Sequence, residues 1–441
     1  MQEKPSSAEQ SKGDTLQVHP SSQPSEGQHS SRVVATTYTI IGWVLQGGVI
    51  LSAAVIFIGL FLELLQPNKF APQKLQMFPQ TFGQVWAGLL ILRPQAVITL
   101  GLLLLIATPV ARVAVSIVAF AVERDWRFVV ITTVVLLILL FSIFYVGGVV
   151  VVGQHQRFQH GEYSWVYPAL IFLAAIAAGL LGSLVGLGGG VLIVPLLTLV
   201  FGFPIYFAIG ASIISVIATS SGAAAAYVKD RITNLRLGMF LELGTTIGAI
   251  CGAFLAGLLA PELLSVIFGI ILLISAAPLV FKIGEELPQG VKNDRWANWL
   301  HLNGSYPDHH LHREVSYEVT RTPLGLAMMY VAGLISGLLG IGSGTFKVLA
   351  LDVVMRLPMK VSTTTSNFMI GVTAAASAGI YFSRGDIPPL IAAPVALGVL
   401  IGALVGARVL ERLSNKILRI TFLTVIVVAA LEMVLRGAGI A

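Results

Sequence analysis

The chain has 441 residues, of which 56% are hydrophobic and only 11% are charged, and its net charge is +6. Soluble domains contain about 25% charged residues, so this composition excludes a soluble protein of this size. Apolar stretches of eighteen or more residues recur, and each is long enough to cross a bilayer. The sequence therefore predicts an all-α integral membrane protein, in which Lys and Arg orient the helices and bind no nucleic acid.

The N-terminal part divides into a tail and a membrane module. Residues 1–38 are rich in Ser and Gln and lack the charged-then-apolar order of a signal peptide, which predicts a disordered cytoplasmic tail. Arg112 lies inside an apolar run, where it either faces protein or water or snorkels to a headgroup. The stretch TPVARVAVSIVAFAVERDWRFVVIT resembles a three-helix membrane domain of unknown function. A three-helix module over 39–152 is expected from the apolar runs 39–65, 96–121 and 128–152.

An internal repeat occupies most of the remaining chain. Residues 179–280 align with 333–434 at a constant offset of 154, without a gap. Duplicated halves of this kind are typical of secondary transporters. The sequence predicts two transporter repeats, joined by a linker, over 166–283, 284–322 and 323–437. Matched pairs include Gly186 and Gly340, Gly190 and Gly344, Pro204 and Pro358, Ser212 and Ser366, and Gly248 and Gly402.

Each repeat contains a long apolar segment, a glycine cluster, a short apolar segment and three full-length segments. The predicted segments are 166–186, 191–202, 206–228, 237–259 and 262–282, matched by 324–340, 345–356, 361–383, 389–411 and 416–436. The fourth segment of each set carries Gly-x-x-x-Gly-x-x-x-Gly, which predicts close packing of two helix backbones. A pore-lining role for these glycines is the alternative.

Basic residues indicate how the repeats are oriented. The loop 229–236 contains Lys229, Arg231 and Arg236, which favours the cytoplasm, whereas its counterpart contains Arg384 beside Asp386. In the next pair of turns the bias is reversed: the one near Pro261 has no basic residue, and its counterpart has Arg408, Arg412 and Lys416. The sequence therefore predicts inverted-topology repeats, with the linker and residues 123–127 in the cytoplasm.

The glycine clusters at 186–190 and 340–344 interrupt apolar helices. Non-helical backbone is tolerated at membrane depth only where it lines a cavity or is buried in protein. Each break would aim the N-terminus of a short helix at a gap near the midplane, where an anion could bind. A ligand-free close helix crossing is the alternative; a nucleotide loop is not supported, because no strand–helix context exists. The predicted contacts are Gly188, Gly189, Gly190, Gly342, Ser343, Gly344 and Thr345.

The second repeat adds polar residues after its break. Lys347 follows Gly344 by three positions, and a charge at the bilayer centre costs at least ~2.5–3.5 kcal/mol, so Lys347 needs a function or a partner. Contact with the anion is expected; an ion pair with Asp352 and snorkelling are the alternatives. The run STTTSN at 362–367 offers further donors, although Ser and Thr in helices often bond their own i−4 carbonyl. Further predicted contacts are Ser212, Thr364, Thr365, Ser366 and Asn367.

Three other polar features are expected to lie outside the site. Glu242 is predicted to be interfacial, with a proton carrier as the alternative. The stretch HLNGSYPDHHLH at 301–312 is predicted to be a solvated loop, with metal binding or pH sensing as the alternatives. The single Cys251 excludes an intramolecular disulfide and is expected to pack.

The stretch GLGGGVLIVPLL, the following AIGAS and the spaced-glycine helix resemble the TauE/SafE family, the toluene sulfonate uptake permeases. The resemblance covers about 166–437 and implies a transporter of small sulfur-containing or organic anions, such as sulfite or sulfonates, often moved with a proton gradient. The second repeat differs, reading GIGSGTFKVLALD, with Ser343, Lys347 and Leu349 where the first has Gly189, Ile193 and Pro195.

The sequence therefore predicts a multi-pass secondary transporter of the cytoplasmic membrane that carries a small anion, coupled to protons. A passive anion channel and a membrane-embedded enzyme or assembly scaffold are the alternatives. The expected partners are the small anionic substrate and membrane lipid, with no nucleic acid, metal or other cofactor; a homodimer is left open.

Overall fold

The computed structural model describes residues 26–65, 78–79, 81–146, 166–185, 190–229, 232–280, 288, 290–308, 313–409 and 415–440. Within these ranges the regular secondary structure is helical apart from one two-stranded hairpin. Seven of the described helices are long and apolar enough to cross a membrane. The predicted all-α integral membrane fold is confirmed.

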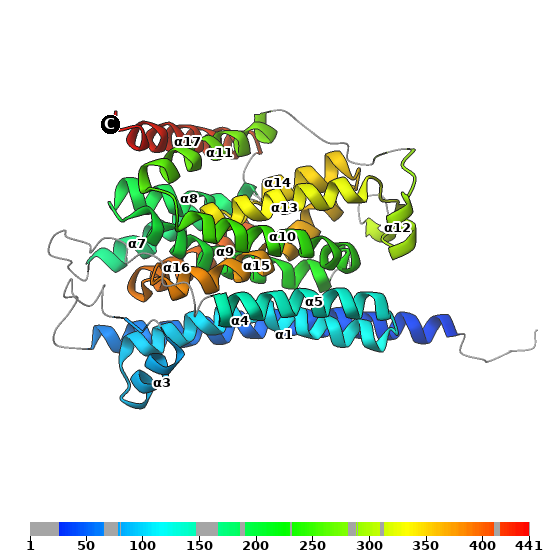
Figure 1. Ribbon diagram of the computed structural model, residues 1–441, viewed down its shortest axis with the longest axis horizontal. Coiled ribbons are helices and arrows are strands. Elements are labelled where there is room, and N and C mark those ends of the chain that lie inside the picture. Colours follow the sequence, from blue (N-terminus) through cyan, green and yellow to red (C-terminus); the bar gives the residue numbers. More distant parts are fainter. Residues whose placement is uncertain are drawn as a thin grey trace, which may run out of the picture.

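The N-terminal module is a layer of three long helices along one flank of the molecule (Figure 1). Helix α1 begins at Glu26, inside the segment 1–38 that the sequence predicts to be a disordered tail, so that prediction is wrong for residues 26–38. Residues 1–25 lie outside the described part. A short helix, α3, lies between the first two long helices. The elements are α1 (Glu26–Leu64), α3 (Phe82–Leu90), α4 (Pro94–Val122), α5 (Trp126–Phe141) and the π-helix η1 (Ser142–Val146).

Two sets of helices follow in the part of the chain where the sequence predicts two repeats. The first set is α7 (Val166–Val185), α8 (Gly190–Pro195), η2 (Leu196–Val200), α9 (Ile205–Lys229), α10 (Leu235–Ala256) and α11 (Pro261–Val280). The second set is α13 (Thr322–Leu339), α14 (Gly344–Leu349), η3 (Ala350–Val354), α15 (Met359–Ser383), α16 (Pro389–Val409) and α17 (Asn415–Gly437).

The short helices of the two sets end in the same way. Each continues into a π-helix, η2 or η3, and the two π-helices occupy positions related by the offset of 154. The hydrogen bond from Phe203 N to the Leu197 carbonyl, 2.9 Å, recurs from Leu357 N to the Leu351 carbonyl, 3.0 Å. Because the residue before η3 is a leucine and the one before η2 is a proline, the proline is not the cause of this geometry.

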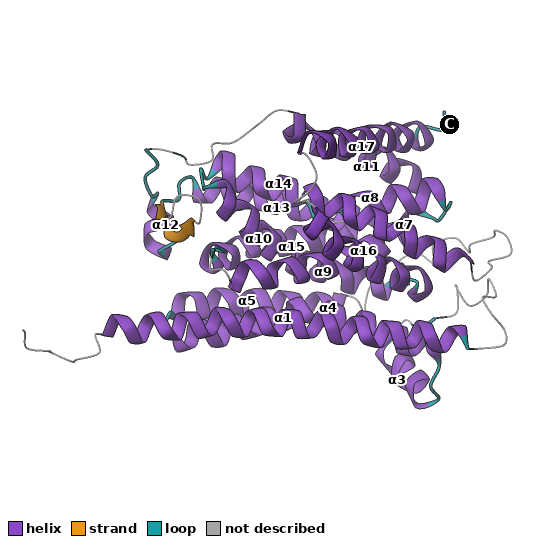
Figure 2. Cartoon of the chain, turned by 180° about the vertical axis from the view of Figure 1, so that it is seen from behind, coloured by secondary structure: helices purple, strands orange, loops and turns teal. Residues whose placement is uncertain are grey.

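Spaced glycines lock helices of one set onto helices of the other. A methyl group on Gly248 in α10 would overlap the Tyr330 carbonyl oxygen in α13. A methyl group on Gly402 in α16 would overlap the carbonyl oxygen of Ile176 in α7, the matching contact at the same offset. The backbones therefore approach closely in both pairs, as small residues four apart allow. Figure 2 shows α16 beside α7 and α10 beside α13.

The linker folds at one end of the molecule, here named the hairpin end, instead of forming the predicted solvated loop. It contains α12 (Arg295–Leu300) and the antiparallel strands β1 (Gly304–Asp308) and β2 (Arg313–Tyr317), paired from Gly304 with Tyr317 to Asp308 with Arg313. His301 is exposed and caps α12, while residues 309–312 lie outside the described part. The described residues contain no group of three metal-ligating side chains.

The loops predicted to share one face meet at the hairpin end. Arg236, in the first turn of α10, forms ion pairs with Asp125 at 3.1 Å and with Glu123 at 3.5 Å. Both acidic residues lie between α4 and α5. Arg127 donates to the Trp299 carbonyl in the linker. At the opposite end, Arg384 after α15 pairs with Asp386 at 2.8 Å, and both side chains are buried. The cytoplasmic assignment of the hairpin end stays a prediction.

Candidate functional site

The glycine break of the second set is a short non-helical segment with several residues in the left-handed region. Helix α13 ends at Leu339 and α14 begins at Gly344, so residues 340–343 separate two helices. Gly340, Gly342 and Ser343 have φ of 69°, 71° and 47°, in the left-handed region that glycine adopts without a steric penalty. The Ser343 hydroxyl is buried and has no hydrogen-bond partner among the described residues. The predicted break at 340–344 is present.

Ser212 joins this break to the start of α8 in the first set. Its hydroxyl lies 2.9 Å from the Gly190 carbonyl oxygen and 2.8 Å from the Gly340 carbonyl oxygen, so one proton serves both. The matching Ser366 donates to the Gly344 carbonyl at 3.3 Å. The break of the second set and the start of α8 are therefore neighbours. Gly188 and Gly189 lie outside the described residues.

Lys347 reaches from α14 into the interior and not toward a headgroup. Its side chain has no exposed surface, and Nζ donates to Oγ1 of Thr373 in α15 at 2.5 Å. Its charged neighbours within the described part of the chain are Glu242 and Arg112. Asp352, the partner weighed from the sequence, is not among them, so the structure favours neither snorkelling nor the Asp352 pair.

Glu242 corrects the sequence prediction most clearly. It was expected at the interface, but it lies in the second turn of α10 with no exposed surface. Its carboxylate accepts from the Thr245 hydroxyl and lies 3.2 Å from Oγ1 of Thr373, which also lies 3.0 Å from the Met369 carbonyl. Thr373 thus links a lysine and a glutamate that sequence reasoning placed apart. Lys347, Thr373 and Glu242 are called the central cluster below.

The polar run 362–367 contributes less than predicted. Thr364 donates to the carbonyl oxygens of Lys360 and Val361 on its own helix, which is the alternative weighed for this run. Thr365 accepts from the backbone N–H of Asn234 at 3.2 Å. Thr345 and Asn367 are half-buried. Of the four residues predicted in this run, only Ser366 contacts a glycine break directly.

Arg112 comes from α4 of the N-terminal module and enters the repeat region. Its side chain is fully buried, with the guanidinium 4.5 Å from the ring centroid of Phe368 in α15. A methyl group on Gly371 would lie 2.8 Å from Nη2 of Arg112. None of the three guanidinium nitrogens has a hydrogen-bond partner among the described residues. The sequence indicates that Arg112 is an intramembrane charge, but it does not predict that Phe368 and Glu242 are its neighbours.

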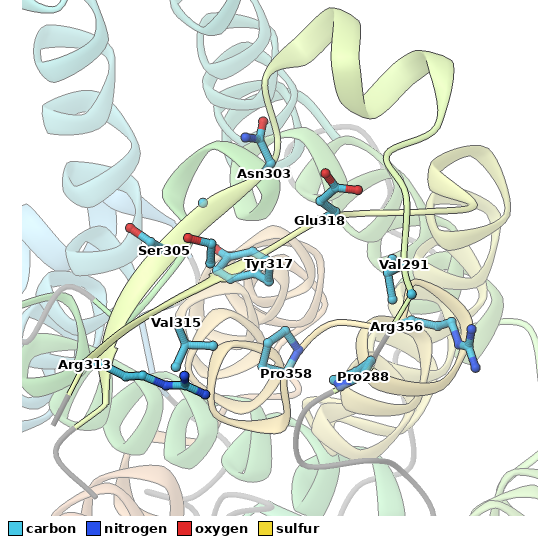
Figure 3. A pocket seen from close by; sticks show the side chains of 13 residues that line it. Pro288, Val291, Asn303, Ser305, Arg313, Val315, Tyr317, Glu318, Arg356 and Pro358 are labelled. Carbon is cyan, nitrogen blue, oxygen red and sulfur yellow. The ribbon is translucent and has the colours of Figure 1, made fainter. Parts of the chain in front are cut away.

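Two cavities lie at the hairpin end, and neither is lined by the central cluster. The larger, of about 740 Å³, lies between the β-hairpin and the residues that precede α15 (Figure 3). The labelled side chains include Arg313, Tyr317 and Glu318 of the linker and Arg356 and Pro358 beside it. The smaller, of about 220 Å³, lies where the module, the α9–α10 loop and the hairpin meet; its lining includes Ser116, Asn234 and Tyr317.

The comparisons agree with this division of the chain. The sequence profile of the sulfite exporter TauE/SafE family matches residues 170–433, and that of a protein of unknown function, DUF1634, matches residues 41–144. The probable membrane transporter protein YunE of Bacillus subtilis is 26% identical over 275 residues, 61% of this chain and 97% of the relative. The probable membrane transporter protein MJ0441 of Methanocaldococcus jannaschii is 25% identical over 289 residues, 62% and 97% of the two chains.

The probable membrane transporter protein YdhB of Bacillus subtilis is 25% identical over 230 residues, 52% of this chain and 84% of the relative. No solved structure matches the chain. The family profile covers more than half of the sequence and includes every helix from which the central cluster is built. With its apolar helices and the glycine break between α13 and α14, the chain is a multi-pass membrane protein that belongs to the TauE/SafE family of membrane transporters.

Proposed function

We propose that the chain is a secondary transporter that moves a small anion across the cytoplasmic membrane together with protons. The observation that carries this proposal is the buried central cluster, in which an ammonium and a carboxylate share one hydroxyl close to the glycine break of the second set. Intramembrane charges of this kind are costly and typically serve transport or proton relay. The profile match and the relatives support a transporter; the anion and its coupling are our inference.

The charges of the cluster suggest how coupling would arise. A substrate anion and the Glu242 carboxylate compete for the same ammonium, because Lys347 has no other carboxylate neighbour in the described structure. Protonation of Glu242 removes this competitor, so proton binding and anion binding favour each other, as linkage requires. The groups that face Glu242 are Lys347, Arg112, Thr245 and Thr373, on four different helices. Protons and anion would then move in the same direction.

Alternating access would use the inverted repeats. The matched glycine contacts and π-helices support two structurally equivalent halves, and α9 and α15 run in opposite directions, since α9 ends and α15 begins at the hairpin end. In transporters built from inverted repeats, one half rocks against the other around a fixed midplane site. The full burial of the cluster fits an occluded state of such a cycle. In this proposal the N-terminal tail and the hairpin end lie in the cytoplasm, as the basic residues favour.

The test is anion flux into proteoliposomes containing the full chain. Sulfite, thiosulfate, a short alkylsulfonate and a short carboxylate are compared with and without an imposed pH gradient. We expect uptake of at least one of these anions, accelerated when the gradient drives protons in the same direction. Flux that follows the anion gradient alone and ignores the proton gradient would identify a passive channel, the alternative from the sequence.

A further inference from the structure

We infer that the N-terminal module completes the anion site, with the Arg112 guanidinium as an anion-binding group between the hairpin end and Lys347. This inference rests on the proposed function. A module of unknown function thereby contributes a substrate contact that the TauE/SafE segment does not contain, because Arg112 lies outside the residues that the family profile matches.

The first support is the unsatisfied state of the guanidinium. Arg112 has no exposed surface, and none of its three nitrogens finds an acceptor among the described residues. Buried polar groups are normally hydrogen-bonded, and an exception calls for an explanation such as an absent ion. The guanidinium carbon lies over the ring of Phe368, which offers no oxygen or nitrogen acceptor. The N–H groups of a guanidinium lie in its plane, where an oxyanion accepts two parallel bonds.

The second support is the surplus of positive charge. In their ionised forms, Arg112 and Lys347 bring two positive charges to one carboxylate, that of Glu242, and these three groups interact with one another. All three side chains have no exposed surface, so water does not screen the excess cation. One bound monoanion would neutralise it. A sulfonate, a sulfite or a carboxylate has the paired oxygens that suit a guanidinium fork.

The third support is the position of the 220 Å³ cavity. Ser116, which lines it, is one helical turn from Arg112 and donates to the Arg112 carbonyl at 3.0 Å. Asn234, also in its lining, donates to Thr365, one turn before Phe368. Along α15, Thr365, Phe368 and Thr373 are successive levels, ~4.5 Å and then ~7.5 Å apart at 1.5 Å per residue. The Arg112 level therefore separates the cavity from the central cluster.

Gly371 shows that the guanidinium position is built into the fold. A methyl group there would lie 2.8 Å from Nη2 of Arg112 and 2.6 Å from Oγ of Ser220 in α9. The absence of a side chain at this point on α15 leaves the space that the guanidinium occupies. Helices α4, α9 and α15 thus shape one pocket for the guanidinium, although the described residues of these helices provide no hydrogen-bond acceptor for it.

The experiment compares Arg112→Lys and Arg112→Gln in the full chain, with Arg124→Gln as the control. The control removes the same charge from an exposed position of the same module. Sulfite flux in proteoliposomes gives KM, and sulfite-dependent thermal stabilisation of purified protein gives affinity. We expect Arg112→Gln to raise KM by about ten- to a hundred-fold. Arg112→Lys should be intermediate, since it keeps the charge and loses the fork, and Arg124→Gln should behave as wild type.

A purely structural arginine would give a different result. It would lower the melting temperature of both Arg112 variants while sulfite KM stayed at the wild-type value, and this outcome would overturn the inference. Gly371→Ala, which displaces the guanidinium without removing it, should raise KM as well; an unchanged KM there would also contradict it. Absence of flux and of anion-dependent stabilisation in the wild-type protein, across the four anions named above, would instead overturn the proposed function and this inference with it.

Discussion

An ammonium without any contact to water must recover its lost hydration from protein groups, and Lys347 has one hydroxyl and one carboxylate for this purpose. Two groups do not saturate three N–H donors. The side chain is therefore held strongly enough to be ordered and has donors left for a ligand. This incomplete satisfaction separates a binding residue from a closed structural ion pair.

Removal of the Lys347 charge should affect stability and binding separately. Lys347→Met removes one of the two cations that face the buried Glu242 carboxylate and leaves only Arg112, so we expect a loss of up to about 3–5 kcal/mol, the range for losing one partner of a buried pair. The double variant Lys347→Met with Glu242→Gln removes both charges and should restore the melting temperature. Neither variant should regain anion affinity, which we expect to fall about ten- to a hundred-fold. Recovery of sulfite stabilisation in the double variant would contradict a direct role for Lys347.

Glu242→Gln tests coupling by itself. The amide keeps the size of the side chain but carries no exchangeable charge, so anion binding no longer depends on a proton at this position. We expect sulfite exchange to persist and its response to an imposed pH gradient to disappear. The control is Glu262→Gln at the start of α11, which removes a carboxylate from a span end far along the chain. A gradient response that survives in Glu242→Gln would locate the coupling elsewhere.

The sequence predicted Lys347 as a site residue but not its partners. Lys347 is conspicuous because it lies alone in apolar sequence next to a glycine cluster. Thr373 and Glu242 lie 26 and 105 positions away on other helices, and only the packing angles of those helices bring them together. Glu242 follows a basic loop closely, so its position along α10 suggests the interface. In the structure it is fully buried and faces Lys347, Arg112 and Thr373.

At the scale of elements, the helices of the two sets were predictable to within a few residues because apolar runs and a constant repeat offset both mark them. The π-helices η2 and η3 were not, since their sequences, LLTLV and ALDVV, match only in one Leu and one Val, and these residue types also occur throughout the α-helices of the chain. Their common geometry comes from the turn that follows each short helix, where a carbonyl bonds an N–H six residues on. Backbone position dictates these turns more than side-chain identity does.

The glycine contacts between sets give an element-scale prediction. Gly248→Ala and Gly402→Ala each place a methyl group onto a carbonyl oxygen of the facing helix, so the helices must separate. We expect each substitution to cost at least about 1–3 kcal/mol, seen as a lower melting temperature of the purified protein. Gly47→Ala in α1 is the matched control, because nothing lies within 4 Å of the added methyl group. Equal melting temperatures for all three variants would show that these glycines are not close contacts.

At the scale of the whole molecule, the N-terminal module is attached to the repeats at several depths. At the hairpin end Arg236 pairs with Glu123 and Asp125, and deeper in the molecule Ser142 of η1 donates to the Ala376 carbonyl of α15 at 2.6 Å. The sequence marked the module as a separate domain because the repeat excludes it. Its attachment was not predictable, since each contact joins residues more than a hundred positions apart.

The junction at Glu123 predicts a pH dependence. Burial raises the pKa of Glu123 above its ordinary value, against the attraction of Arg236 and with the help of Asp125. A carboxyl group with a raised pKa contributes most to stability when protonated, and that contribution is lost as the pH rises through the raised value. Glu123→Gln should therefore match wild type in melting temperature at acid pH and exceed it at neutral pH.

Asp125→Asn is the comparison at the same junction. It removes the shorter ion pair with Arg236, which is partly exposed, so it should lower the free energy of unfolding at neutral pH by no more than about 1 kcal/mol and lower the melting temperature accordingly. Both effects are measured by thermal unfolding of the purified protein across acid to neutral pH. Parallel curves for Glu123→Gln and wild type at every pH would contradict the assignment to Glu123.

The exchange of helices between the sets has a consequence for how the protein is made. Helix α7 leaves the ribosome early, but its partner α16 begins about 200 residues after α7 ends. At about 5–20 residues per second, α7 waits roughly 10–40 s in the bilayer before its glycine-lined partner arrives. Until then its packing face is open to lipid or to an insertion chaperone. The first set of helices therefore cannot complete its packing until α16 has been made, close to the end of translation.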